Sequence, residues 1–200
     1  LACQYLLAGD IEKIIITSRD PSPPPLSYLK SSGGIFKDMM IHDFDIARFY
    51  SGTDEFESVF ATGSNLTDKR FDKINDFELA TSVLKTKKGV QCIITNSRHC
   101  NFGHDQRIEL FGSKGMIISD NKRELETSIF SKNSTENKSP LMHFFIQRYS
   151  EAYKIQLENL ARLCKKNTNP IASFEDGRRS LVIAETAIKS LKSKKFEKVF

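Results

Sequence analysis

Residues 32–52 read SGGIFKDMMIHDFDIARFYSG, and this stretch brings a histidine, several carboxylates and a glycine-rich entry into one short span. Gly33 and Gly34 supply a loose backbone, Asp38 is acidic as the first turn of a helix favours, and Gly52 follows the last apolar position as a stop. The stretch therefore predicts one helix, most of whose circumference is apolar and buried.

Three ionisable residues, Asp38, His42 and Asp45, interrupt this apolar surface. On a helix with about 3.6 residues per turn they would project from one face, within roughly 60° of one another. Ionisable side chains are costly to bury unless they are paired. We therefore expect this face to meet a partner or a water-filled cavity.

An acid one helical turn before a histidine suits acid-base chemistry. Asp38 could orient His42, which could take a proton from a substrate hydroxyl near neutral pH. Two alternatives stay open. Asp38 could stabilise the helix N-terminus while His42 is a hydrogen-bonded core histidine, or the pair could chelate a metal ion, although the spacing marks no third ligand.

The bulk composition is that of an ordinary globular domain. The chain has 200 residues, of which 39% are hydrophobic and 28% charged, and a net charge of +5. The lysines cluster near the ends of expected helices without interleaved aromatics, which argues against nucleic-acid binding. No apolar run is long enough for a membrane span. The four cysteines have no metal-type spacing, so we expect reduced thiols in a cytoplasmic protein.

Alternating or β-branched runs predict strands, and a tight turn at residues 87–89 favours an antiparallel sheet. The expected strands are Glu12–Ser18, Phe56–Gly63, Phe77–Thr86, Val90–Arg98, Gln106–Phe111 and Glu124–Phe130. The four prolines of the segment PSPPPLSYLK predict that residues 21–30 form an extended connection without regular structure, and residues 131–140 are expected to form a polar, mobile loop. Residues 1–10 are expected to be the end of a preceding helix, and 11–200 the main domain.

Two helices are expected near the end of the chain. Residues 141–166 and 174–193 carry apolar side chains at helical spacing, which we interpret as core-facing stripes. Ser173 and Asp176 are spaced as a capping box at the start of the second. The predicted fold is α+β: an open, mostly antiparallel sheet with helices packed on one face.

Loops at strand ends supply further candidate residues. Arg19 and Lys30 could reach the cavity, although either could be a solvated surface cation. The turn around Gly103 could place His104 over a pocket, or could be an ordinary surface turn. No G-x-G-x-x-G lies between a strand and a helix, so the chain as given shows no dinucleotide-binding fingerprint.

Four segments together resemble the C-terminal domain of the Gfo/Idh/MocA oxidoreductases, most closely the inositol 2-dehydrogenase branch. They are ITSRDPSPPP at 16–25, SGGIFKDMMIHDFDIARF at 32–49, NSR at 96–98 and GHDQRIELFGSKGM at 103–116. The resemblance covers nearly the whole chain and preserves motif order. It favours the acid-base interpretation of Asp38 and His42.

The resemblance implies an NAD-dependent oxidation of a polyol ring hydroxyl to a ketone. NAD would be bound mainly by an N-terminal Rossmann domain absent from this chain, so the chain alone should be inactive. The open sheet would cover the substrate and mediate dimer or tetramer contacts. His42 would match the acid-base histidine, Asp38 its partner, and Asp45 an acidic position near the substrate.

The chain departs from the family pattern at Met40, Phe102 and His104, where related sequences usually carry Thr, Tyr and Tyr. These changes alter hydrogen bonding to a polyol, and we expect His104→Phe to raise KM. Two other functions stay open: a non-catalytic assembly module that pairs through its sheet, being a fragment or degenerate homologue, and a metal-dependent hydrolase using Asp38 and His42.

Overall fold

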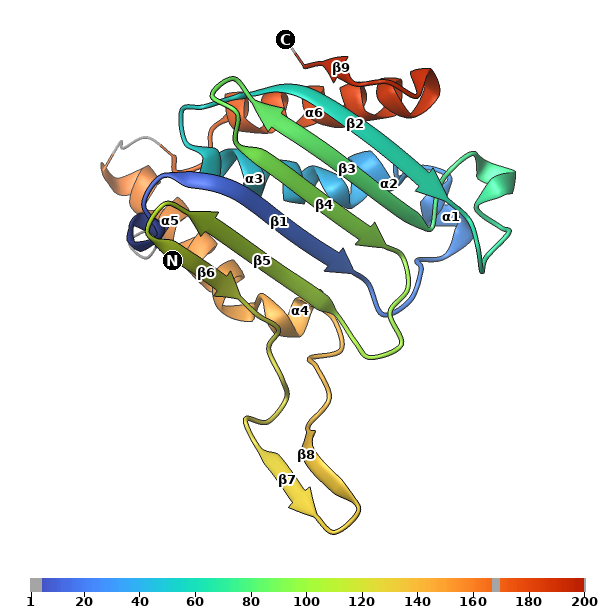
Figure 1. Cartoon of the computed structure of the whole chain (residues 1–200), viewed down its shortest axis with the longest axis vertical. Coiled ribbons are helices and arrows are strands. Elements are labelled where there is room, and N and C mark those ends of the chain that lie inside the picture. The colour runs from blue at the N-terminus through green and yellow to red at the C-terminus, as the bar shows by residue number, and fades with distance from the viewer. Residues whose placement is uncertain (1–4, 167–169, 200) are drawn as a thin grey trace.

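The computed structural model describes residues 5–166 and 170–199, and its centre is a seven-stranded sheet (Figure 1). The strands follow the spatial order β6-β5-β1-β4-β3-β2-β9. Their bounds are β1 Ile11–Arg19, β2 Phe56–Ser64, β3 Leu79–Thr86, β4 Gln91–Ser97, β5 Asp105–Gly112, β6 Gly115–Ser119 and β9 Glu197–Lys198. β1 and β4 pair in parallel, and the other described pairs of this sheet are antiparallel. The expected mostly antiparallel sheet is confirmed.

Helices cover one face of this sheet and lie behind it in Figure 1. The two long core helices are α3, Met40–Ser51, and α6, Phe174–Ser193, which pack on each other and on the sheet. Buried apolar side chains from both layers form the core, among them Ile14, Ile16, Phe44, Ala47, Leu84, Ile94, Ile183 and Ala187. Burial of this apolar area is the main stabilising contribution to the fold.

The start of α6 confirms the expected capping box. Ser173 Oγ accepts a hydrogen bond from Asp176 N at 3.3 Å, and Asp176 Oδ2 accepts one from Ser173 N at 2.8 Å. Each side chain thus satisfies a backbone donor that the helix itself leaves unpaired.

The opposite face of the sheet is open. Leu110 is buried on the helix side, so its neighbour Phe111 points to the open side. Phe111 pairs with Met116, and Glu109 pairs with Ile118. Phe111, Met116 and Ile118 are 45%, 52% and 54% exposed, so apolar side chains lie on the uncovered face.

The expected single helix over residues 38–51 is wrong. It is divided into α2, Ile35–Asp38, and α3, because Met39 lies between them at φ −115° and ψ −60°. α2 is held at both ends by side chains from elsewhere in the fold: Asp76 binds the N–H of Ile35, and Arg98 binds Asp38. These tertiary contacts override the local helical pattern.

The proline-rich connection is less irregular than expected. Its prolines remain outside regular structure, but a short helix, α1, follows them at Leu26–Leu29. Pro25 precedes the first residue of α1, and its carbonyl accepts hydrogen bonds from the N–H groups of Tyr28 and Leu29. Leu29 is buried, which anchors the connection to the body of the domain.

A β-hairpin projects from the domain (Figure 1) where the sequence suggested a strand followed by a mobile loop. Its strands are β7, Ser128–Ser131, and β8, Ser134–Lys138. Only the last part of the expected strand Glu124–Phe130 is therefore a strand, and residues 134–138 pair with it. β6, a short edge strand, was also missed.

The expected helix over residues 141–166 is divided into α4, Phe145–Arg148, and α5, Ser150–Lys166. Its apolar stripe is not a core stripe, since Tyr153, Leu157 and Leu160 are 45%, 67% and 56% exposed. Helical periodicity shows that one side of a helix is apolar, but not whether this chain itself covers that side.

Near the start of the described chain, residues Tyr5–Ala8 form a 3-10 helix, η1, and a second, η2, spans Asp72–Ile74. Residues 1–4, including Cys3, lie outside the described residues. Cys92, Cys100 and Cys164 are free thiols. Among the residues described, no helix has the length and apolar character needed to cross a membrane.

Candidate active site

The carboxylate of Asp38, the last residue of α2, is held by two side chains. Tyr28 Oη donates to Oδ1 at 2.5 Å, and Arg98 Nη1 donates to Oδ2 at 2.5 Å. Tyr28 is 49% exposed whereas Arg98 is 1% exposed, so one partner lies at the surface and the other in the interior. The hydrogen bond to Asp38 is the main reason that the pKa of Tyr28 is raised.

Arg98 also links Asp38 to a second carboxylate. Its Nη2 lies 3.8 Å from Asp76 Oδ2, and Asp76 Oδ1 accepts a hydrogen bond from the N–H of Ile35 at 2.8 Å. Asp76 therefore accepts a hydrogen bond from the backbone at the N-terminus of α2, and Arg98 donates one to the side chain of its last residue, Asp38. The sequence patterns assign no role to Arg98 or Asp76. The available signal was an arginine directly after a buried strand, a residue type that is rarely buried unless it is paired.

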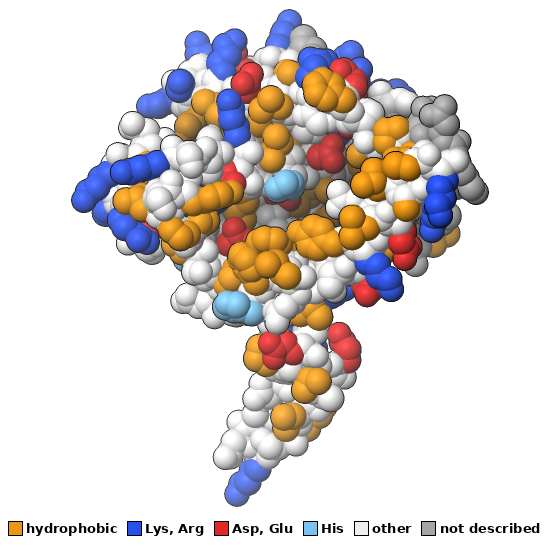
Figure 2. Space-filling view, turned by 180° about the vertical axis from the view of Figure 1, so that it is seen from behind, with side chains coloured by type: hydrophobic (Ala, Val, Ile, Leu, Met, Phe, Trp, Pro, Cys, Tyr) orange, Lys and Arg blue, Asp and Glu red, His pale blue; other side chains and the backbone are white. Residues whose placement is uncertain are grey.

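His42 lies in the first turn of α3 and is exposed. In the described part of the chain its imidazole forms no hydrogen bond or ion pair, whereas both oxygens of Asp38 are engaged. Figure 2 shows the helix-covered side of the molecule, which is hollowed near its centre, with a histidine and acidic side chains beside the hollow. An exposed, unengaged imidazole is free to exchange protons with a bound molecule.

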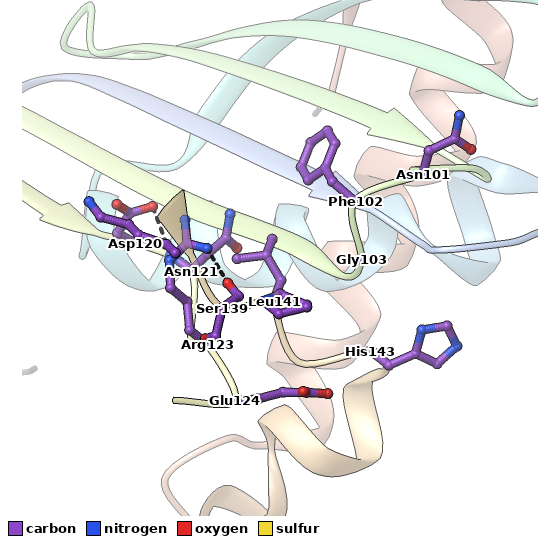
Figure 3. A pocket seen from close by; sticks show the side chains of 12 residues that line it. Asn101, Phe102, Gly103, Asp120, Asn121, Arg123, Glu124, Ser139, Leu141 and His143 are labelled. Atoms are coloured by element: carbon purple, nitrogen blue, oxygen red, sulfur yellow. Dashed lines mark hydrogen bonds between the residues drawn. The ribbon is translucent and has the colours of Figure 1, made fainter. Parts of the chain in front are cut away.

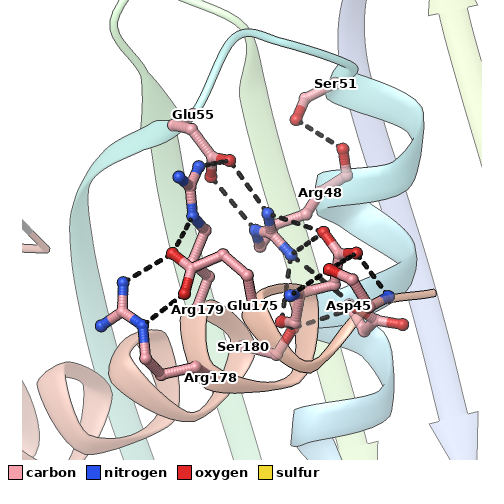
Figure 4. Close-up of polar contacts among 10 residues, drawn as sticks. Asp45, Arg48, Ser51, Glu55, Glu175, Arg178, Arg179 and Ser180 are labelled. Carbon is pink, nitrogen blue, oxygen red and sulfur yellow. Dashed lines mark hydrogen bonds and ion pairs between the residues drawn. The ribbon is translucent and has the colours of Figure 1, made fainter. Parts of the chain in front are cut away.

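Asp45 is not aligned with Asp38 as we expected. Its Oδ1 accepts a hydrogen bond from Ser180 Oγ of α6 at 3.1 Å and lies 3.8 Å from Arg48 Nη1 (Figure 4). Arg48 also donates to Glu55 at 2.9 Å and to the Asp176 carbonyl oxygen at 3.1 Å. Asp45 thus belongs to a polar cluster that joins α3 to α6. The helix break at Met39 removes the common face that regular periodicity predicted.

Asp43, next to His42, is a buried carboxylic acid that sequence reasoning missed. Its Oδ1 accepts from Ser18 Oγ at 2.6 Å and its Oδ2 from Asn96 Nδ2 at 2.7 Å. Burial raises the pKa of Asp43 to about 6, and the hydrogen bonds from Ser18 and Asn96 oppose part of this rise. Through these two hydrogen bonds the Asp43 carboxyl group links the start of α3 to the ends of β1 and β4.

Arg19 and Lys30, the two candidate substrate-binding cations, lie in different environments. Arg19 Nη1 pairs with Asp105 Oδ2 at 2.9 Å, and Asp105 also accepts from Arg107 Nε at 2.7 Å. These arginines hold the pKa of Asp105 below its usual value despite its burial. Lys30 is exposed at the end of α1 and forms no side-chain contact in the described chain. Their substrate contacts remain predictions.

His104 is buried rather than presented at a surface turn, with 4% of its area exposed. Its Nδ1 lies 3.4 Å from Asp20 Oδ1, and its ring meets the Tyr149 ring edge to face at a centroid distance of 6.1 Å. Neither ring nitrogen forms a hydrogen bond with the described residues. A buried imidazole with unused nitrogens is unusual, and its substrate contact remains a prediction.

Two cavities lie beside this region without containing Asp38 or His42 in their linings. One, of about 620 Å³, lies where the β7–β8 hairpin leaves the domain and is lined by Phe102, Arg123, Leu141 and His143, among others (Figure 3). A smaller cavity of about 370 Å³ is lined partly by Arg98 and His99. His42 is exposed and Asp38 is half-buried, and neither lines one of these two cavities.

Metal binding receives no support from the described side chains. Within residues 5–166 and 170–199, no three His, Cys, Asp or Glu residues are grouped as a metal ion would require. His42 is exposed and can exchange protons with a bound molecule, and Asp38, four positions earlier in sequence, is held in place by two donors.

The domain is of the α+β class: an open, mostly antiparallel sheet with helices on one face. Asp38 ends one short helix and the exposed His42 lies in the first turn of the next. The model of the GFO/IDH/MocA C-terminal domain matches residues 7–118. The chain belongs to this family.

Relatives with assigned names agree with this membership. The chain is 45% identical over 184 residues to the myo-inositol 2-dehydrogenase of Thermotoga maritima, covering 92% of this chain and 54% of that protein. It is 42% identical over 187 residues to the inositol 2-dehydrogenase of Rhizobium meliloti, covering 94% and 56%. The scyllo-inositol 2-dehydrogenase (NAD(+)) of Bacillus subtilis is 31% identical over 93% of this chain and 54% of its own length.

A solved structure shows the same fold. The crystal structure of a probable dehydrogenase from Thermotoga maritima superposes with a TM-score of 0.94 at 42% identity, covering 99% of this chain and 59% of the other. The chain thus spans about half the length of the curated relatives that it matches.

Proposed function

We propose that this chain is the substrate-binding and acid-base half of an NAD-dependent oxidoreductase that resembles inositol 2-dehydrogenase and oxidises a polyol ring hydroxyl to a ketone. The names of the relatives support a cyclic polyol as the substrate class. The observation that carries the proposal is the exposed, unengaged His42, four residues after a carboxylate that Arg98 and Tyr28 hold.

In this proposal His42 takes the proton of the substrate hydroxyl. The Asp38 carboxylate, four positions earlier in sequence and fixed by Tyr28 and Arg98, would carry the charge opposite to that of the imidazolium that results. A bound NAD would supply the acceptor for the hydride that leaves the carbon bearing this hydroxyl. His42 and Asp38 supply no hydride acceptor, so their part is limited to proton transfer and its electrostatic support.

Among the described residues, the segment after β1 does not have the glycine turn and long helix of a dinucleotide-binding site. It continues instead into a proline-rich connection and four-residue helices. We propose that NAD, the cofactor named for the Bacillus subtilis relative, is bound mainly by a second domain. That domain would also close the open surface beside His42.

We further propose that the open face of the sheet pairs with another copy of the chain. Phe111, Met116 and Ile118 expose apolar area on β5 and β6, and such area is commonly covered in an assembly. The same observation favours the alternative function, a non-catalytic assembly module. The two functions differ in catalysis: the oxidoreductase oxidises a polyol and needs His42 for turnover, whereas the assembly module catalyses no reaction.

A panel of cyclic polyols tests the proposal. The polypeptide that joins this chain to its cofactor domain is incubated with NAD and each polyol, and NADH is followed by its absorbance. We expect oxidation of at least one inositol stereoisomer. A folded, oligomeric polypeptide that binds NAD and oxidises none of them would favour the assembly module instead.

A further inference from the structure

Tyr28 is the exposed member of the group that holds Asp38. It lies on α1, between the proline-rich connection and the loop that enters α2. Its neighbour Leu29 is buried and anchors the helix, while the Tyr28 side chain remains 49% exposed. The residue therefore presents a large aromatic ring to solvent from an anchored backbone.

The hydrogen-bonding capacity of Tyr28 is only partly used. A phenol has one O–H donor and oxygen lone pairs that accept. The donor is directed to Asp38 Oδ1 at 2.5 Å. Because a carboxylate only accepts, the tyrosine proton stays committed to it, and the remaining capacity of the phenol oxygen is to accept from a donor such as a hydroxyl.

Arg98 makes this arrangement rigid. It donates to the other carboxylate oxygen, Asp38 Oδ2, from a position that is 1% exposed. The carboxylate is therefore fixed from the interior, and the phenol is oriented by a group that cannot easily move. Loss of the tyrosine hydroxyl would leave the Arg98–Asp38 pair in place, so the contribution of Tyr28 can be measured separately.

Resting on the proposed function, we propose that Tyr28 is a substrate-binding residue. Its oxygen accepts a hydrogen bond from the polyol hydroxyl on a carbon next to the one that is oxidised, and its exposed ring packs against the apolar face of the polyol ring. The tyrosine takes no part in the proton or hydride transfer. It acts on how tightly the polyol binds and on which stereoisomers are accepted.

The test compares Tyr28→Phe with a matched control in the polypeptide that carries the cofactor domain. Tyr28→Phe keeps the ring and removes the oxygen, and we expect KM for the best polyol to rise about tenfold, as for one lost hydrogen bond, with kcat within about twofold. The control Tyr153→Phe changes another exposed tyrosine, on α5, and should leave both constants unchanged. An unchanged urea-unfolding midpoint for Tyr28→Phe confirms that folding is intact.

A deoxy analogue of the polyol, lacking the hydroxyl next to the oxidised carbon, distinguishes binding from a structural effect. We expect it to bind the unaltered enzyme about tenfold more weakly, and Tyr28→Phe to add little further loss. The assignment is overturned if the deoxy analogue binds Tyr28→Phe about a hundredfold more weakly than the polyol binds the unaltered enzyme, which is the product of the two separate losses. It is also overturned if Tyr28→Phe lowers kcat with KM unchanged. If the unaltered polypeptide oxidises no polyol, the proposed function itself fails.

Discussion

Arg98 and Asp38 join the end of β4 to the end of α2 through a hydrogen bond of 2.5 Å from a guanidinium that is almost fully buried. The contact spans 60 positions in sequence, and it fixes the carboxylate next to the break that separates α2 from α3. A buried ion pair of this kind adds little net stability, but loss of one partner leaves the other charge without compensation.

Arg98→Met should therefore be strongly destabilising, because Asp38 and Asp76 would both lose their cation. We expect the free energy of unfolding to fall by about 3 to 5 kcal/mol, measured by urea denaturation. The matched change Arg178→Met removes an exposed partner of Glu175 and should cost less than about 1 kcal/mol. Similar losses for the two variants would contradict the buried role of Arg98.

Because of the buried Asp43, we expect the free energy of unfolding to fall as pH rises from about 4 to about 6. Its pKa is raised to about 6 in the folded state by burial, so the folded protein binds this proton more readily than the unfolded chain. The contribution of Asp43 is most favourable below about pH 4, and it declines as pH rises towards about 6, by on the order of 2 to 3 kcal/mol.

Comparison with Asp43→Asn isolates this contribution. The amide can accept from Asn96 and donate to Ser18, so it keeps both contacts without a titrating proton. We expect the stability of the unaltered protein, relative to Asp43→Asn, to decline between pH 4 and 7 in urea titrations. A constant difference across that range would show that Asp43 does not titrate as described.

Phe44 and Phe49 provide a test of the face that α3 buries. Phe44 is fully buried against the sheet and α6, whereas Phe49 on the same helix is 49% exposed. Phe44→Ala should cost about 3 to 5 kcal/mol by leaving a cavity, and Phe49→Ala much less. Equal costs in thermal or urea unfolding would show that α3 is rotated relative to this structure.

The β7–β8 hairpin should contribute little to the stability of the domain. Ile129 and Phe130 are 62% and 69% exposed, and an isolated two-stranded hairpin is marginally stable in water. Replacement of residues 128–138 by a short glycine-serine turn should change the free energy of unfolding by less than about 1 kcal/mol. A large loss of stability would indicate that the hairpin packs on the domain.

Local signals allowed much of the fold to be predicted. The strand runs before residue 112, the hairpin at residues 87–89 and the Ser173–Asp176 capping box depend on neighbours in sequence, and the structure confirms them. The break at Met39 could not be predicted in this way, because Asp76 and Arg98 anchor α2 from distant parts of the chain. Helical periodicity likewise identified the apolar side of α5 but not its exposure.

The candidate site was predictable only in part for the same reason. Asp38 and His42 stand out through spacing and through resemblance to the family, whereas Tyr28 and Arg98 become partners of Asp38 only through folding. Asp43 was overlooked because a second acid beside His42 carries no periodic signal. Its burial follows from the contacts of β1 and β4.

The central claim is that His42 exchanges the proton of the substrate hydroxyl, and its most direct test is the turnover of His42→Ala. In the polypeptide that includes the cofactor domain, with saturating polyol and NAD, we expect kcat to fall by about 10² to 10⁴. The circular dichroism spectrum should be unchanged, since His42 is exposed and forms no side-chain contacts within the described residues. Turnover close to that of the unaltered enzyme would contradict the account.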